Sequence, residues 1–141
     1  MTVDERFDLA AMEGCFDGTI PPVIATCSKD GMPHATYLSQ LNFVDDEHVA
    51  LSNQFWNRTS ANLADNPRAS VLVTDSHTYE TYRLALQLER RDTDGPIFDK
   101  LRVSIDALAK MMGMEDIFRL RSADVYRVLS CTRIAGPTQP R

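Results

Sequence analysis

The residues with the clearest chemical potential lie in one polar stretch, from Ser52 to Pro67. Asn57 and Thr59 are both good helix N-cap residues, and the Asn66-Pro67 pair forces the chain out of helical geometry. Alanine and leucine residues between them favour a helix. We therefore expect a short helix that begins near Thr59 and is stopped by the proline.

The first turn of that helix could hold a phosphate group. Its backbone N–H groups have no partner within the helix, and the helix dipole places partial positive charge there. The Arg58 guanidinium and the hydroxyls of Thr59 and Ser60 would supply a charge and further donors. The alternative is that Asn57 or Thr59 only caps a surface helix while Arg58 faces water. Such caps are common, so this window taken alone favours the alternative.

Other chemically capable residues show no pattern typical of a site. The histidines have no metal-ligand spacing, so we predict no metal site. The cysteines are odd in number without a CxxC pair, so we expect free thiols. No Ser-His-Asp or Cys-His arrangement can be recognised, and any catalysis would depend on a bound cofactor. The residues concerned are His34, His48, His77, Cys15, Cys27 and Cys131.

Composition limits the class of protein. A chain of 141 residues with 43% hydrophobic and 25% charged residues fits one globular domain, which we place at residues 1–135, with 136–141 as a tail or the start of a linker. The formal net charge of −5 makes nucleic acid a poor partner. No apolar run reaches the roughly 20 residues that a bilayer requires, and the N-terminus does not resemble a signal peptide. We expect a cytoplasmic protein that does not bind membranes.

Hydrophobic periodicity and turn residues predict the elements that position this stretch. Asp30-Gly31 is typical of a tight hairpin turn, and Gly113 of a helix end. The expected elements are an amphipathic helix at 3–16 that covers one end of the fold, strands at 23–28, 34–44 and 48–52, the short helix near 59, strands at 69–74 and 79–89, a helix from 96 to 112, and one or two strands within 116–134.

This order lacks the alternation of strand and helix that parallel sheets need, so the strands should be antiparallel. So many strands in a short chain would leave edges unprotected unless the sheet curls. We predict a mainly β fold, a small closed or split barrel with peripheral helices. The strand at 34–44 has two mixed faces, which suggests a ligand or a partner chain in front of it.

Four motifs carry a resemblance to a known family. In order they are I-P-P-V-I-A-T (20–26), D-G-M-P-H-A-T-Y-L-S (30–39), F-V-D-D-E-H-V-A-L-S (43–52) and N-R-T-S-A-N-L-A-D-N-P-R-A-S-V-L-V (57–73). Together they resemble the pyridoxamine 5′-phosphate oxidase-like family, which has an antiparallel split β-barrel of the FMN-binding type. The resemblance implies a homodimer with two FMN sites at the subunit interface, each built from both chains.

Carried over by position, the resemblance implies that the strand from Thr36 to Leu41 faces the isoalloxazine ring of FMN. It also implies that the polar stretch meets the ribityl chain and the phosphate. Tyr82 falls where the neighbouring subunit usually reaches across. Trp56 could stack on a ligand or lie at the subunit interface. The implied cofactor-binding residues are Thr36, Tyr37, Leu38, Ser39, Leu41, Ser52, Asn53, Asn57, Arg58, Thr59 and Tyr82.

The sequence also departs from the family's pattern. Members that oxidise vitamin B6 phosphates tend to have arginine at the position of Thr36 and lysine at those of Leu41 and Thr59. They also continue into a C-terminal segment that clasps substrate and flavin, which we do not find here. We therefore expect no true pyridoxamine phosphate oxidase activity.

Three functions remain open. The first is an oxidoreductase that passes hydride between a nicotinamide or small organic substrate and FMN. The second is a module that senses or stores a flavin, a deazaflavin or haem without turnover. The third is a dimerisation domain that has no cofactor. The missing lysines favour the last two, and the general pattern favours the first.

Overall fold

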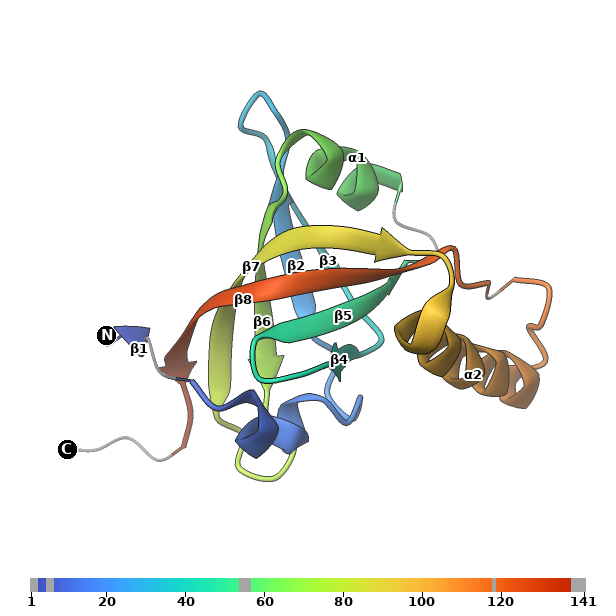
Figure 1. Cartoon of the computed structure of the whole chain (residues 1–141). Helices are drawn as coiled ribbons and strands as arrows, with labels where there is room; N and C mark the ends of the chain where they lie inside the picture. The colour runs from blue at the N-terminus through green and yellow to red at the C-terminus, as the bar shows by residue number, and fades with distance from the viewer. Residues whose placement is uncertain (1–2, 5–6, 54–56, 118, 138–141) are drawn as a thin grey trace.

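One antiparallel sheet dominates the computed structural model and curls into an open barrel (Figure 1). The structure describes residues 3–4, 7–53, 57–117 and 119–137. Within them, seven strands are hydrogen-bonded in the order β3-β2-β6-β7-β8-β5-β4, and β1 pairs with β8. The elements are β1 (Val3–Asp4), η1 (Leu9–Cys15), β2 (Val23–Cys27), β3 (Pro33–Tyr37), β4 (Leu41–Phe43), β5 (His48–Asn53), α1 (Asn57–Asp65), β6 (Arg68–Thr74), β7 (Thr81–Asp92), α2 (Gly95–Met112) and β8 (Ser122–Ala135).

This architecture confirms the predicted mainly β split barrel with antiparallel strands and peripheral helices. The hairpin between β2 and β3 turns at Gly31, whose φ of 86° lies in the left-handed region that glycine adopts readily. Helix α2 ends at Gly113 as expected, with φ 66° and its N–H on the carbonyls of Ala109 and Lys110. Helix α1 begins at Asn57, two residues before the predicted start.

The predicted continuous strand at 34–44 is wrong. It is divided into β3, which pairs with β2, and β4, which pairs with β5. Leu38 and Leu41 are both buried in the core. Residues three apart point to opposite faces of a regular strand, so burying both requires a bend. Pairing between Leu38 N–H and the Pro22 carbonyl, and between Gln40 Nε2 and the Phe16 carbonyl, holds that bend.

The predicted helix at 3–16 is also wrong. Val3 and Asp4 form β1, which pairs with the last strand, and a short 3₁₀ helix follows over Leu9–Cys15. Met12 breaks the helical geometry with φ −103° and ψ 32°. The segment still covers one end of the barrel, since Leu9 is fully buried and the Phe16 ring lies 6.2 Å from the Phe43 ring between centroids.

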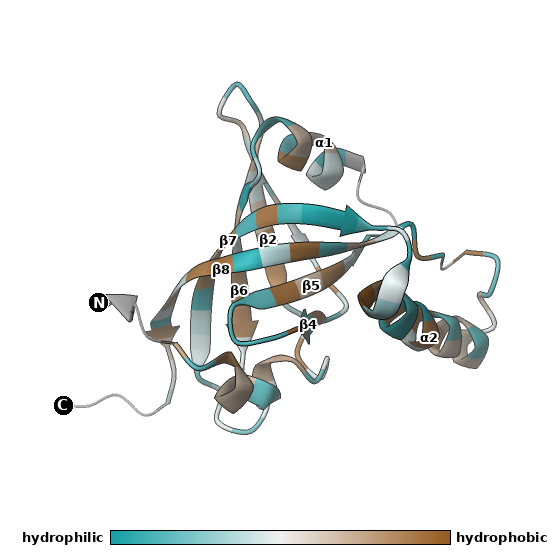
Figure 2. Cartoon of the chain, in the orientation of Figure 1, coloured by the Kyte–Doolittle hydropathy of each residue, from teal (hydrophilic) through white to brown (hydrophobic). Residues whose placement is uncertain are grey.

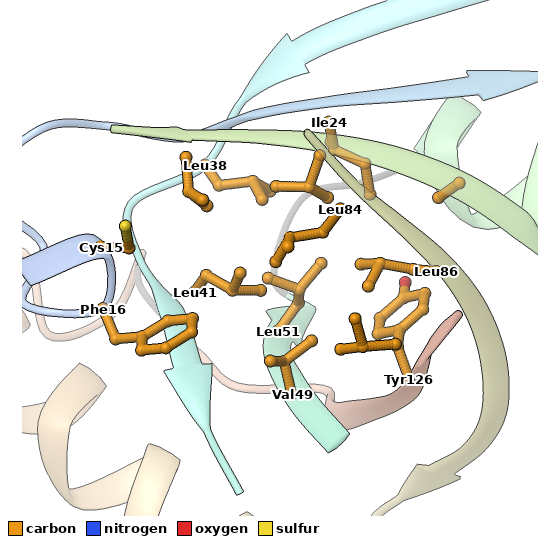
Figure 3. Packing of buried hydrophobic residues seen from close by; sticks show 14 of the residues in the cluster. Cys15, Phe16, Ile24, Leu38, Leu41, Val49, Leu51, Leu84, Leu86 and Tyr126 are labelled. Carbon is orange, nitrogen blue, oxygen red and sulfur yellow. The ribbon is translucent and has the colours of Figure 1, made fainter. Parts of the chain in front are cut away.

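The core fills the inside of the curled sheet. Inward positions alternate along β6 and β7, so that Val71, Val73, Leu84 and Leu86 are fully buried. Figure 2 shows the hydrophobic residues spread along these strands, and Figure 3 shows the side chains that meet, including Tyr126 of β8. The end of β7 nearest α1 is hydrophilic (Figure 2).

The two α-helices lie outside the barrel, at the end where β7 stops and β8 begins (Figure 1). Helix α2 packs against the sheet through a second apolar cluster that includes Leu101, Ala50 and Val125. Helix α1 contacts β2, with Leu63 buried in the main core. In the part of the chain described, no helix combines the length and apolar character needed to span a membrane.

Candidate functional site

The end of β5 is buried beside the start of β8. Ser52 pairs with Ala123 and Asn53 with Ser122, and the Arg121 N–H donates to the Asn53 carbonyl at 2.8 Å. The chain then continues into α1. Residues 54–56 lie outside the described residues, so the expectation for Trp56 lies outside them too, and for Asn57 only the backbone is described.

A cluster of polar side chains joins these strand ends to α1. Nδ2 of Asn53 donates to Ser60 Oγ at 3.0 Å and to Asp124 Oδ2 at 3.2 Å. Ser122 Oγ donates to the other carboxylate oxygen of Asp124 at 2.6 Å. Arg91, at the end of β7, has Nε 3.8 Å from Asp124 Oδ2 and donates through Nη2 to the Ser60 carbonyl at 3.2 Å. Residues of β5, β7 and β8 therefore meet at the carboxylate of Asp124. Two of them, Asn53 and Arg91, also contact Ser60 in the first turn of α1.

Asp124 is fully buried, and burial raises the pKa of its carboxyl above the usual range. The hydrogen bond from Ser122, the charge of Arg91 and the hydrogen bond from Asn53 act in the opposite direction. Two buried polar atoms near the carboxylate, Asn53 Oδ1 and the Tyr126 hydroxyl, have no hydrogen-bond partner among the described residues. Burial, followed by the charge of Asp124, raises the pKa of Tyr126.

The first turn of α1 presents two different side chains. Thr59 is buried, with 1% of its surface exposed, so its hydroxyl faces the protein rather than bulk water. Arg58 is exposed, and within the described residues it makes no ion pair. A cation therefore stands at a helix N-terminus beside the buried Thr59. This arrangement suits an anion, because the backbone N–H groups and the guanidinium attract the same charge.

The residues predicted to face the flavin ring, from Thr36 to Leu41, differ in how far their side chains are buried. Thr36 is half-buried opposite Ile24 of β2, and Tyr37 is 75% exposed on the outer face. Leu38 and Leu41 have their side chains in the core, so only their backbone groups could meet a ligand. Ser39 is exposed at the bend between β3 and β4.

Tyr82 does not join the other predicted site residues within one chain. It lies on β7 opposite Val73, half-buried against the main core. It lies nine positions along β7 from Arg91 beside α1, about 30 Å along a strand. Burial, with smaller contributions from nearby acidic groups and thiols, raises the pKa of Tyr82.

A surface cavity of about 410 Å³ lies between α2 and the bend that follows β3. One wall is polar, with Asp17, Ser39 and Gln40, and the other is apolar, with Leu108 and Met111. The cavity therefore contains one predicted site residue, Ser39. Its size is adequate for a small organic molecule.

All three cysteines are free, as expected, with Cys15 and Cys131 buried. No group of three potential ligands is placed to hold a metal ion in the described ranges. His48 is held between carboxylates, with Nδ1 2.8 Å from Asp45 and Nε2 2.6 Å from Glu89.

Asp124, Arg91 and Ser122 were not among the residues predicted from the sequence. A signal was present, since Asp124 is an acidic residue inside the otherwise apolar run A-D-V-Y, where an unpaired charge would be costly. Their partners could not be identified in advance, because Asn53 and Asp124 are 71 positions apart.

Comparison with solved structures places the fold in a class. An FMN-binding protein from Syntrophomonas wolfei subsp. wolfei is similar with TM-score 0.73 at 17% identity, over 91% of this chain and 88% of that one. An F420 reductase is similar with TM-score 0.58 at 15% identity, over 85% and 94%. The heme storage protein HutZ from Vibrio cholerae is similar with TM-score 0.60 at 13% identity, over 93% and 97%. The fold is therefore the split barrel seen in FMN-binding proteins.

The family model described as pyridoxamine 5'-phosphate oxidase matches residues 11–129. The chain belongs to this pyridoxamine 5'-phosphate oxidase-like family, as its motifs indicated. No curated protein matches the sequence.

Proposed function

We propose that the protein binds FMN and uses it as an oxidoreductase, passing hydride between a nicotinamide or small organic substrate and the flavin. The observation that carries this proposal is the first turn of α1. There an exposed Arg58 stands at a helix N-terminus that hydrogen bonds from Asn53 and Arg91 to Ser60 attach to the ends of β5 and β7. A phosphate is the anion that such a turn binds well.

The residues present fit FMN. Arg58 and the N–H groups of the first turn would hold the phosphate. Asn53 Oδ1, a buried acceptor that has no partner among the described residues, lies at the base of the same turn. Bound FMN would supply hydride transfer at its isoalloxazine ring. Backbone groups of β3 and the bend at Ser39 would orient that ring, with the 410 Å³ cavity open to a substrate beside them.

The outer face of the sheet supports the proposal of a homodimer. On that face Tyr37 and Leu72 both pair with Val23, and they are 75% and 37% exposed. Ala25 and Ala35 continue the exposed surface with small side chains. Exposed apolar side chains gathered on one face of a sheet are typical of a covered interface.

The alternative function is binding of a deazaflavin or haem without turnover. It is supported by the similarity of the fold to an F420 reductase and to a heme storage protein. Among the histidines, His48 is already held by Asp45 and Glu89, so it is poorly available as an iron ligand. A cytoplasmic location stays a prediction from the sequence.

The test is the absorption spectrum of the purified protein, with mass spectrometry of the small molecule released on denaturation. We expect a flavin spectrum, release of FMN, and bleaching of the flavin by NADH, NADPH or a reducing organic substrate. A bound deazaflavin or haem would replace this proposal with the alternative. Failure to bind added FMN would remove the oxidoreductase function altogether.

A further inference from the structure

Asp124 is a buried acid to which the proposed contacts with FMN assign no role. None of its surface is exposed, and both of its oxygens accept hydrogen bonds, from Ser122 Oγ at 2.6 Å and Asn53 Nδ2 at 3.2 Å. An ionised carboxylate is the acceptor-only form that suits this geometry, and Arg91 stands near it at 3.8 Å. Burying such a charge is costly unless its partners are well placed.

The partners of Asp124 lead to one place, the first turn of α1. Asn53 divides its Nδ2 between the carboxylate and Ser60 Oγ. Arg91 donates to the Ser60 carbonyl while its Nε faces the carboxylate. Ser60 is thus held through both its side chain and its backbone, by two residues that share Asp124.

This arrangement has a physical consequence for anion binding. The backbone N–H groups of a helix terminus bind a phosphate well only when they are held in a fixed direction, and displacements near 1 Å are enough to weaken such contacts severely. The proline after α1 and the buried Leu63 fix the rest of the helix. The cluster around Asp124 fixes the turn that carries Arg58.

We propose that Asp124 is a positioning residue for the phosphate site, acting through Asn53 and Arg91 on the first turn of α1. This inference rests on the proposed function, because it assigns a role in binding the FMN phosphate. Asp124 does not touch the ligand. It orients the donors that do.

The test compares two ligands in three proteins. FMN and riboflavin differ only in the phosphate, so the ratio of their dissociation constants isolates the phosphate contribution. In Asp124→Asn we expect FMN affinity to fall about tenfold or more while riboflavin affinity changes less than about twofold. The matched control is Glu80→Gln. Glu80 is also buried and forms an ion pair with Arg133, and it immediately precedes β7, at the other end of the barrel. That variant should lose stability but keep the parental ratio.

A second variant protects the test against misfolding. Asp124→Asn combined with Arg91→Met removes both charges of the pair, and Arg91→Met is measured alone beside it. If Arg91 acts through the cluster, this double variant should show the same loss of FMN preference as Asp124→Asn. A loss equal to the product of the two single losses would show that Arg91 contacts the phosphate independently and would overturn the shared role of Asp124.

The other outcomes separate the two proposals. Equal weakening of both ligands, or an unchanged ratio, would show that Asp124 is only structural while FMN binding stands. A parental protein that binds neither ligand would overturn the proposed function and this inference together.

Discussion

Asn62 Nδ2, in the middle of α1, donates a hydrogen bond to Thr26 Oγ1 of β2 at 3.1 Å, and both side chains are buried. The contact joins positions 36 residues apart. Together with the hydrogen bond from Asn53 to Ser60 in the first turn, it attaches α1 to two separate strands. The helix that carries Arg58 is therefore fixed at two points.

Asn62→Ala should reduce the free energy of unfolding by about 1–3 kcal/mol, because it leaves the Thr26 hydroxyl buried without this partner. Equilibrium unfolding in urea measures the change. Adding Thr26→Val should recover part of the loss, since both polar partners are then absent. If the double variant is less stable by the full sum of the single losses, the two side chains do not interact.

Local signals were sufficient to predict most of the fold. Asp30-Gly31 and Gly113 identified a turn and a helix end, and hydrophobic periodicity identified the strands at 23–28, 69–74 and 79–89. Two predictions failed where long-range packing decides the backbone. Leu38 and Leu41 bend one strand into two because both enter the core, and pairing with β8 makes Val3 extended instead of helical.

For the candidate site, the polar stretch around Arg58 was visible because its residues are adjacent in sequence. The structure brings Ser52, Asn53 and Thr59 to the same end of the barrel, although contact with a ligand stays a prediction. Asp124 and Arg91 could not be assigned to that end, because the pairing of β8 with β5 and β7 brings them there.

Thiol reactivity should divide the three cysteines. Burial, with lesser contributions from Asp75, Cys131 and Asp17, raises the pKa of Cys15 to about 12, which leaves almost no thiolate at neutral pH. Cys27 is only partly buried. A thiol reagent should therefore modify Cys27 first in the folded protein and all three after denaturation without reductant. Detection of a single thiol after denaturation would indicate a disulfide instead.

The His48 contacts should contribute to stability in mild acid. The hydrogen bond to His48 is the main cause that lowers the pKa of Glu89 below its ordinary value of 4.5. A group whose pKa is lower when folded stabilises the fold above its unfolded pKa and loses that contribution as pH falls through its folded pKa. The stability difference between the parent and His48→Gln should thus shrink as pH falls below about 4.5, as urea unfolding from pH 6 to 3 would show. A difference that stays constant over this range would contradict the role of Glu89.

Replacement of Tyr37 by glutamate should disrupt the proposed homodimer. The side chain is 75% exposed on the apolar outer face, where a dimer would bury it and an unpaired carboxylate would be costly. Light scattering at micromolar concentration should show a dimer for the parent and a monomer for Tyr37→Glu, with Tyr79→Glu, also exposed at 64%, as the control outside the β3 face. A monomeric parent would contradict the dimer directly.

Arg58→Ala tests the phosphate site itself. Arg58 is exposed and lies in α1, so alanine removes the cation without disturbing the core or the contacts of Ser60. A charge-assisted hydrogen bond contributes roughly 1.5–3 kcal/mol, so FMN affinity should fall about ten- to a hundredfold. Riboflavin, which has no phosphate, should bind almost as before, and flavin fluorescence quenching measures both. Arg68→Ala is a suitable control, because Arg68 is also exposed but follows α1 at the start of β6. If Arg58→Ala binds FMN as tightly as the parent, or weakens both ligands equally, Arg58 does not hold the phosphate and the helix N-terminus has another role.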